Sequence, residues 1–232
     1  MKVSSIKSLL ILMLFTVFTI SSTYSQENRK SYTSTSLEMI FSFADIQVEG
    51  VNTKNILRWA PVLNIQYIYN YDAKDNFGVF TGIDMKNLGF IWENEQGEKW
   101  KHRVYALGVP VGFKFGNLNS GMFLYGGAEL EYAFNYKQKY FLNGTKEEKD
   151  VYWFTDRVNI FQGSLMLGVN FPHGFNIKFK YYLTDLMNQD YEAYDENGDK
   201  YKPYESMTSS QVFFISLSFN MFHRDYEYFH KE

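Results

Sequence analysis

Eight stretches of alternating apolar and polar residues constrain the fold of this chain more than any other feature. Within them β-branched and aromatic residues dominate, and Pro61 and Pro110 are the only prolines. An alternation of period two is that of a β-strand with two unlike faces. The sequence predicts strands at 35–48, 57–71, 77–91, 99–115, 122–138, 153–170, 174–185 and 208–222. We expect an all-β, antiparallel, up-and-down sheet of eight strands that closes into a barrel.

The connections between these strands are short and long by turns. Compact segments rich in turn-forming residues follow the second, fourth and sixth strands, at 72–76, 116–121 and 172–173. Longer segments follow the first, third, fifth and seventh strands, at 49–56, 92–98, 139–152 and 186–207. Transmembrane barrels with an even number of strands have short periplasmic turns and longer external loops. The alternation therefore predicts a transmembrane barrel with both termini in the periplasm.

The orientation of the two faces is a separate question, because a soluble ligand-binding barrel has the same alternation with its apolar face inward. An eight-stranded barrel holds little more than its own side chains, and many of the glycines fall on the polar face, which favours a polar interior. The four tryptophans lie at the loop-side ends of strands and predict an aromatic girdle, formed by Trp59, Trp92, Trp100 and Trp153. The membrane interpretation requires that Leu63, Ile65, Ile177, Phe179 and Leu217 point outward.

The N-terminal segment resembles a secretory signal. Lys2 and Lys7 form a basic start, residues 9–20 are almost wholly apolar, and Ser25 precedes a predicted cut before Gln26. The predicted organisation is a signal peptide at 1–25, a polar periplasmic lead at 26–34, an outer-membrane barrel at 35–222 and a periplasmic tail at 223–232. The chain has no cysteine, which excludes disulfides and a thiolate metal site.

Composition agrees with a membrane barrel and excludes one class of partner. Aromatic residues make up 19% of the chain, although the mean hydropathy is only −0.33. This combination is typical of a barrel in which only every second strand residue meets lipid. The formal net charge of −3 lacks the basic excess that nucleic-acid binding normally requires.

The polar face predicts a closed network inside the barrel. Its charged members are four acids and five bases, which nearly cancel, as a plug of paired charges requires. A polar pathway for a small solute is the alternative. The predicted lumen residues are Glu38, Arg58, Gln66, Asp84, Lys86, Lys114, Glu129, Glu131, Lys178 and Lys180.

Catalysis has only weak support in the sequence. His102 projects inward near the external mouth, and Thr208 or Ser210 would have to meet it to form an outer-leaflet, lipid-modifying hydrolase. No spacing forces that contact, so we predict a protein that is not an enzyme and has no cofactor. The acidic segment 190–199 lacks the glycine and distal glutamate spacing of a calcium loop, and no metal site is predicted.

The segment Leu107-Gly108-Val109-Pro110-Val111-Gly112-Phe113-Lys114, together with the signal and the eight strands, resembles the PorT-like small outer-membrane β-barrel proteins of Bacteroidetes. The resemblance implies residence in the bacterial outer membrane, among lipid and lipopolysaccharide. It also implies that Phe222, an aromatic near the end of the last strand, is read by the barrel-insertion machinery. Recognition, adhesion or assembly contacts with a protein partner are then expected from the external loops.

Overall fold

The computed structural model describes residues 30–195 and 197–223. The predicted signal peptide at 1–25, the first residues of the predicted lead and the tail from 224 onward lie outside the described residues. The first strand begins at Lys30, so the second half of the predicted lead is part of the barrel wall. Residues 30–34 pair in register with residues 68–72, which explains the earlier start.

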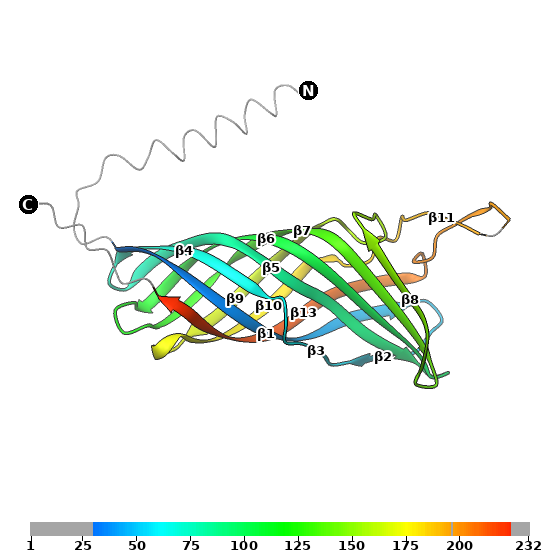
Figure 1. Cartoon of the computed structure of the whole chain (residues 1–232), viewed down its shortest axis with the longest axis horizontal. Helices are drawn as coiled ribbons and strands as arrows, with labels where there is room; N and C mark the ends of the chain where they lie inside the picture. Colours follow the sequence, from blue (N-terminus) through cyan, green and yellow to red (C-terminus); the bar gives the residue numbers. More distant parts are fainter. Residues whose placement is uncertain (1–29, 196, 224–232) are drawn as a thin grey trace, which may run out of the picture.

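Eight antiparallel strands form a closed ring, because the last strand pairs with the first (Figure 1). β1 begins and β13 ends at the same end of the barrel. This arrangement confirms the predicted eight-stranded antiparallel barrel. In ring order the strands are β1 (Lys30–Val48), β4 (Ile65–Lys74), β5 (Phe77–Asn94), β6 (Glu98–Asn117), β7 (Met122–Leu142), β9 (Phe161–Asn170), β10 (Phe175–Asp185) and β13 (Met207–His223).

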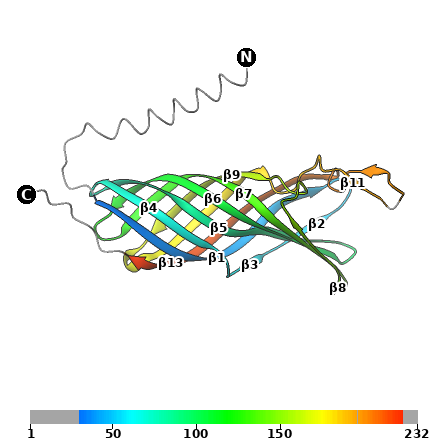
Figure 2. The same cartoon turned by 45° about the horizontal axis from the view of Figure 1, so that its top comes forward.

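We call the two rims the turn end and the loop end. The turn end carries the short connections, including a 3-10 turn, η2 (Pro172–Gly174). At the loop end, β5 and β6 stay paired out to Glu93 and Lys99, and β7 continues into β8 (Thr145–Trp153) as a hairpin that extends past the barrel (Figure 2). A second, smaller hairpin at this end pairs β11 (Ala193–Tyr194) with β12 (Lys200–Tyr201).

Two predicted elements have different boundaries. The second predicted strand is interrupted at residues 61–64, where Pro61 lacks an N–H and Leu63 has a φ of 61°. It becomes β3 (Arg58–Ala60) and β4, preceded by β2 (Thr53–Ile56), which pairs with β5. The sixth predicted strand, expected from residue 153, begins only at Phe161. Most of the predicted loop 139–152 is instead strand, because β7 and β8 form a hairpin there that ends at Trp153. Asn143 and Gly144 both have positive φ, the conformation of a two-residue hairpin turn.

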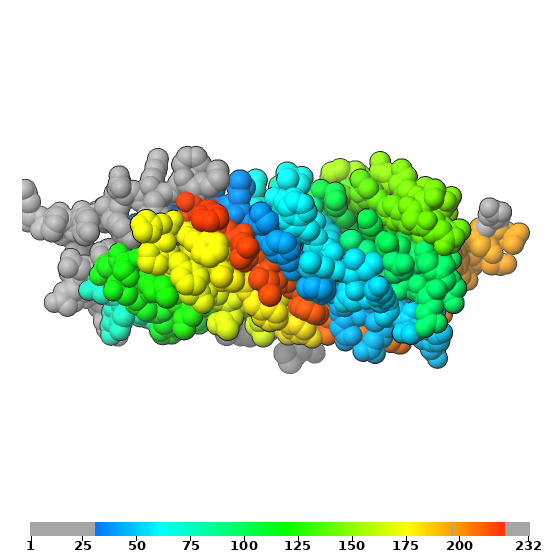
Figure 3. Space-filling view, turned by 90° about the horizontal axis from the view of Figure 1, so that it is seen from below, coloured from blue at the N-terminus to red at the C-terminus, as the bar shows by residue number. Residues whose placement is uncertain are grey.

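The outer wall is apolar along the ring strands. Leu63, Ile65, Ile177 and Phe179 are exposed and Leu217 is half-exposed, so the predicted outward orientation is confirmed. The space-filling view shows the strands as diagonal bands over one face, with β1 between β13 and β4 (Figure 3). Among the described residues, no helix is long and apolar enough to cross a bilayer.

The interior is polar only in part. Its turn-end half and its middle are lined by charged and amide side chains, whereas its loop-end half is an apolar core. The sequence predicts a polar lumen, and the apolar loop-end half is a difference from that prediction. The members of this core are Ile40, Ala44, Ile46, Ala60, Leu88, Phe90, Trp92, Val104, Ala133, Tyr136, Val158, Tyr182, Leu186, Met187, Tyr204, Met207, Val212 and Phe214.

Candidate functional site

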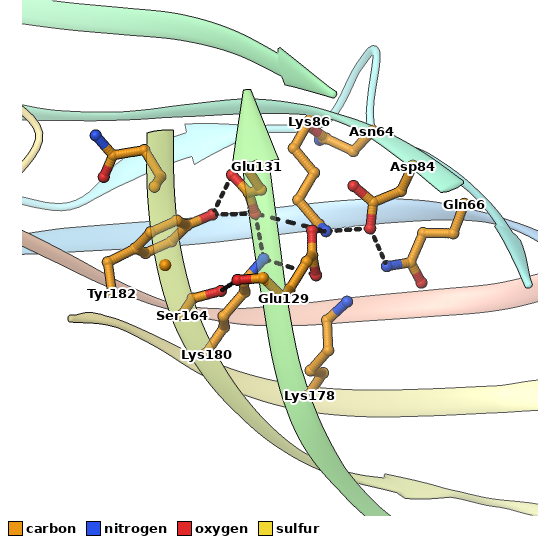
Figure 4. A network of polar contacts seen from close by, with 12 residues as sticks. Asn64, Gln66, Asp84, Lys86, Glu129, Glu131, Ser164, Lys178, Lys180 and Tyr182 are labelled. Carbon is orange, nitrogen blue, oxygen red and sulfur yellow. Dashed lines mark hydrogen bonds and ion pairs between the residues drawn. The ribbon is translucent and has the colours of Figure 1, made fainter. Parts of the chain in front are cut away.

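A cluster of buried charges occupies the middle of the lumen (Figure 4). Lys86 of β5 contacts Asp84 on its own strand and Glu129 of β7, two strands away in the ring, and lies 3.8 Å from Glu131. Lys180 of β10 contacts Glu129 at 2.8 Å and also contacts Glu131. The hydroxyl of Tyr182 donates to both oxygens of Glu131, at 2.7 and 2.9 Å.

Glu38 of β1 extends this cluster toward the turn end. Its Oε1 lies 2.5 Å from Nζ of Lys178 and accepts a hydrogen bond from Ser216 at 3.2 Å. We call the whole set the central charge cluster; among the described residues it contains four carboxylates and three lysines. Its members are Glu38, Asp84, Lys86, Glu129, Glu131, Lys178 and Lys180.

The absence of a side chain at Gly108 makes room for this cluster. A Cβ at Gly108 would collide with carboxylate oxygens of Glu129 and Asp84. Gly108 belongs to the segment 107–114 that the sequence singled out, and its position on the polar face follows from strand alternation. The small residue lets long, oppositely charged side chains meet at the barrel axis, where eight strands leave little free space.

Three of the predicted lumen residues lie apart from the central charge cluster or at its margin: Arg58, Gln66 and Lys114. Arg58 is buried in the wall, where its guanidinium donates to the side-chain and backbone oxygens of Asn87 and lies 3.5 Å from Ser42 Oγ. Gln66 is half-buried and donates to Asp84 at 3.4 Å. The interruption at residues 61–64 explains the position of Arg58, because β3 pairs with β1 instead of continuing β4.

Lys114 marks the turn-end half of the lumen. Its Nζ lies 2.6 Å from Asp72 and donates to Tyr32 and Asn70, each at 3.0 Å. Lys114, Tyr32 and Asn70 line a hollow of about 660 Å³ that includes the open space at its mouth. Asp72 was expected in a turn; its role was missed because β4 continues to Lys74 and so turns Asp72 inward.

The loop-end core is closed by a chain of hydrogen bonds around His102. Trp92 Nε1 donates to His102 Nε2 at 3.3 Å, so the opposite nitrogen carries the proton and donates to Tyr136 at 2.9 Å. Tyr136 in turn donates to Gln138 at 2.8 Å. His102 is 2% exposed, and burial lowers its pKa to about 3. It is therefore a neutral structural residue at neutral pH.

The described residues do not form the histidine–hydroxyl contact that the hydrolase alternative requires. The neighbours of His102 are Trp92, Tyr136 and Phe90. Ser210 is buried and bonded to Asp185, while Thr208 is exposed and donates to a backbone carbonyl. No described contact joins the histidine to either hydroxyl, and no described group of three or more His, Asp or Glu side chains is arranged to hold a metal ion.

The four tryptophans divide into two pairs. Trp59 and Trp153 are 60% and 64% exposed on the outer surface, as an aromatic girdle requires. Trp92 is only 7% exposed and stacks on Trp100, with ring centroids 4.2 Å apart, against the loop-end core. Placing this pair in the girdle was wrong, because both are even-numbered residues of β5 and β6, and even-numbered residues in this part of the two strands face inward.

For the predicted insertion signal Phe222, the structure describes the backbone but not the side chain. Residue Phe222 pairs with Thr35 of β1, and its side chain lies outside the described part of the chain. The role of Phe222 stays a prediction.

The loop end presents tyrosines to solvent. Tyr194 and Tyr201 are 66% and 51% exposed on the β11–β12 hairpin. Below them, the Arg157 guanidinium lies over the rings of Tyr152 and Tyr191, at 4.2 and 4.8 Å from their centroids. Tyrosine and arginine are enriched where proteins bind one another, since they combine large apolar area with polar ends.

Solved structures similar to this chain share little sequence with it. A search of curated proteins finds no match. Two crystal structures of Ail, the attachment invasion locus protein of Yersinia pestis, are similar to the chain. The structure in complex with the heparin analogue sucrose octasulfate has 15% identity and a TM-score of 0.36, and the other has 16% and 0.34. Each alignment covers 83% of this chain and 97% of Ail.

The family of this chain is shown by its sequence. The family model for the outer membrane protein beta-barrel domain matches residues 24–188, which is most of the chain. Its match, the closed ring of eight strands and the apolar outer wall together place the protein in the bacterial outer membrane. The chain belongs to the outer-membrane β-barrel domain family.

Proposed function

We propose that this protein is a closed, non-enzymatic outer-membrane barrel whose loop-end hairpins make recognition, adhesion or assembly contacts with a protein partner. Family membership supports a non-enzymatic role. Within the family, the segment Leu107–Lys114 supports a place in the PorT-like group. The turn end, with both ends of the barrel domain, faces the periplasm, as in other barrels of this kind.

The observation that carries the proposal is the filled lumen. Toward the loop end, Leu88, Phe90 and Phe214 are buried in an apolar core. In the middle, the central charge cluster crosses the bore with paired charges (Figure 4). Buried ions would have to lose these partners for a solute to pass, at a cost of several kcal/mol per ion. A barrel blocked in two successive layers serves as a rigid support.

Reconstitution in a planar bilayer tests closure. We expect no steady conductance from the wild-type barrel. A variant in which Leu88, Phe90 and Phe214 are changed to glycine should at most admit small ions, since the central charge cluster stays in place. A porin inserted into the same bilayers checks that insertion is detected. A stable wild-type channel would overturn the closed-barrel proposal.

Site-specific crosslinking in intact cells tests the loop contacts. A photo-crosslinking amino acid is placed at Tyr194 or Tyr201 on the β11–β12 hairpin and, as a matched control, at the exposed lipid-facing Ile83. We expect a discrete protein adduct from the hairpin positions and none from Ile83. If neither hairpin position gives an adduct, or if Ile83 gives the same one, the hairpin does not carry the contact.

A further inference from the structure

Seven basic residues share one face of the sheet where β6, β7 and β8 extend past the barrel. Antiparallel pairing places Lys101, Lys139 and Lys149 directly opposite one another across the three strands. Arg103 is opposite Lys137 in the next row toward the barrel. We call this set the basic face; its members are Lys99, Lys101, Arg103, Lys137, Lys139, Lys146 and Lys149.

Few acidic side chains of the protein neutralise the basic face. Glu93 pairs with Lys99 at 3.0 Å, and it is the one described carboxylate in an ion pair with a member of the face. The acidic residues Glu148 and Asp150 of β8 lie opposite Tyr140 and Gln138, on the other face of the sheet. Like charges placed directly across strands destabilise a sheet, so a row of three lysines is a cost that an external anion would relieve.

The ionisation of these lysines reflects the same crowding. Partial burial lowers the pKa of Lys101, and the ammonium groups of Lys99 and Lys139 lower it further. Desolvation also lowers the pKa of Lys137, with added repulsion led by Lys149. Both groups lie beyond the apolar band of the wall, where solvent and ions reach them.

A cluster of aromatic rings beside the basic face indicates its depth in the membrane. Tyr105 and Phe134 have ring centroids 6.4 Å apart, and Phe134 and Trp153 stack at 6.1 Å. Aromatic side chains of membrane barrels collect at the level of the lipid headgroups. On β6, Arg103 lies two residues beyond Tyr105, on the face that continues into the exposed Leu107. Two strand residues span about 7 Å, so the basic face begins at headgroup level and points sideways.

We propose that the basic face binds the phosphate groups of lipopolysaccharide in the outer leaflet of the membrane. The phosphorylated sugars of this lipid would lie against the lysine rows and Arg103, while its acyl chains lie along the apolar wall below. Arginine and lysine are the usual ligands of phosphate, arginine with two parallel hydrogen bonds and lysine as a point charge. The sideways orientation favours a membrane lipid, because a soluble partner would approach from the loop tips.

Binding of purified lipid A to the full barrel in phosphatidylcholine vesicles tests the proposal. The test variant changes Lys101, Lys139 and Lys149 to glutamine. The control variant makes the same change at three lysines elsewhere, the exposed Lys74 and Lys200 and the half-buried Lys202. Heat-modifiable gel mobility shows that each variant is folded.

We expect affinity for bisphosphorylated lipid A to fall at least about tenfold in the test variant and to stay unchanged in the control. Wild-type affinity should also fall when both lipid A phosphates are removed. Equal lipid A binding by the wild type and the test variant would overturn the proposal. So would a result in which only a soluble sulfated polysaccharide, and not lipid A, depends on the three lysines.

Discussion

Lys86 is the cation on which the central charge cluster depends most, and changing it to methionine should destabilise the barrel. Lys86 contacts Asp84 and Glu129 and lies 3.8 Å from Glu131, with no exposed side-chain surface. The substitution leaves four buried carboxylates with two lysines. Removing one partner of a buried ion pair costs about 3–5 kcal/mol, because the remaining charge stays desolvated. We expect Lys86→Met to lower the free energy of unfolding by that amount at neutral pH.

Urea unfolding in lipid vesicles, followed by tryptophan fluorescence and heat-modifiable mobility, measures the effect. The matched control is the double variant Lys86→Met with Asp84→Asn, which restores the original difference between acids and bases. Replacing a whole buried pair is often neutral, so the double variant should recover most of the loss. A loss below about 1 kcal/mol in the single variant, or no recovery in the double variant, would refute the argument that paired charge stabilises this interior.

Three further changes test the wall, the lipid-facing band and the loop-end core. Gly89→Ala should lower the free energy of unfolding by about 2 kcal/mol or more, since Gly89 has a φ of 146° and a Cβ there meets the carbonyl of His102. The control Gly163→Ala has open space around the added Cβ and should be near neutral in the same urea titration. Val111→Arg should cost about 2–4 kcal/mol in vesicles, and Leu107→Arg, nearer the edge of the band, should cost less; equal costs would contradict the assigned depth. Because burial lowers the pKa of His102 to about 3 from 6.5, the unfolded chain takes up a proton between these pH values and the folded one does not. Stability should therefore fall as the pH decreases from about 6.5, by up to about 1.4 kcal/mol per unit, and His102→Gln should remove that part of the dependence measured between pH 7.5 and 5.

Much of the candidate site could be read from local alternation. Every second residue of a strand lies on the same face, so the inner face can be assigned without knowledge of the partners. This rule places Glu129, Glu131 and Lys180 inside the barrel. The partners could not be read this way, because Lys86 is on β5 and Glu129 on β7, two strands that do not pair with each other but flank β6 on opposite sides. Asp72 was missed since its position depends on how far β4 continues before its turn.

The tryptophans show a second limit of local reasoning. The positions of Trp92 and Trp100 near strand ends predicted an outward girdle, yet the pairing of β5 with β6 continues as far as Glu93 and Lys99. That pairing keeps both rings in the phase of the inner face. Strand length is decided by cross-strand pairing, and no residue within the strand marks where such pairing stops.

By itself, the sequence determined an antiparallel eight-stranded barrel, its apolar exterior and its charged middle, because each depends on the two-residue period within a strand and on the lengths of the connections. Only the tertiary structure decided that the interior is layered, with the apolar core around Phe90 above the charges around Lys86. It also decided that Lys101, Lys139 and Lys149 form one row. Strands in a closed barrel are tilted and staggered, so residues at one level come from distant parts of the chain, and their grouping is set by register.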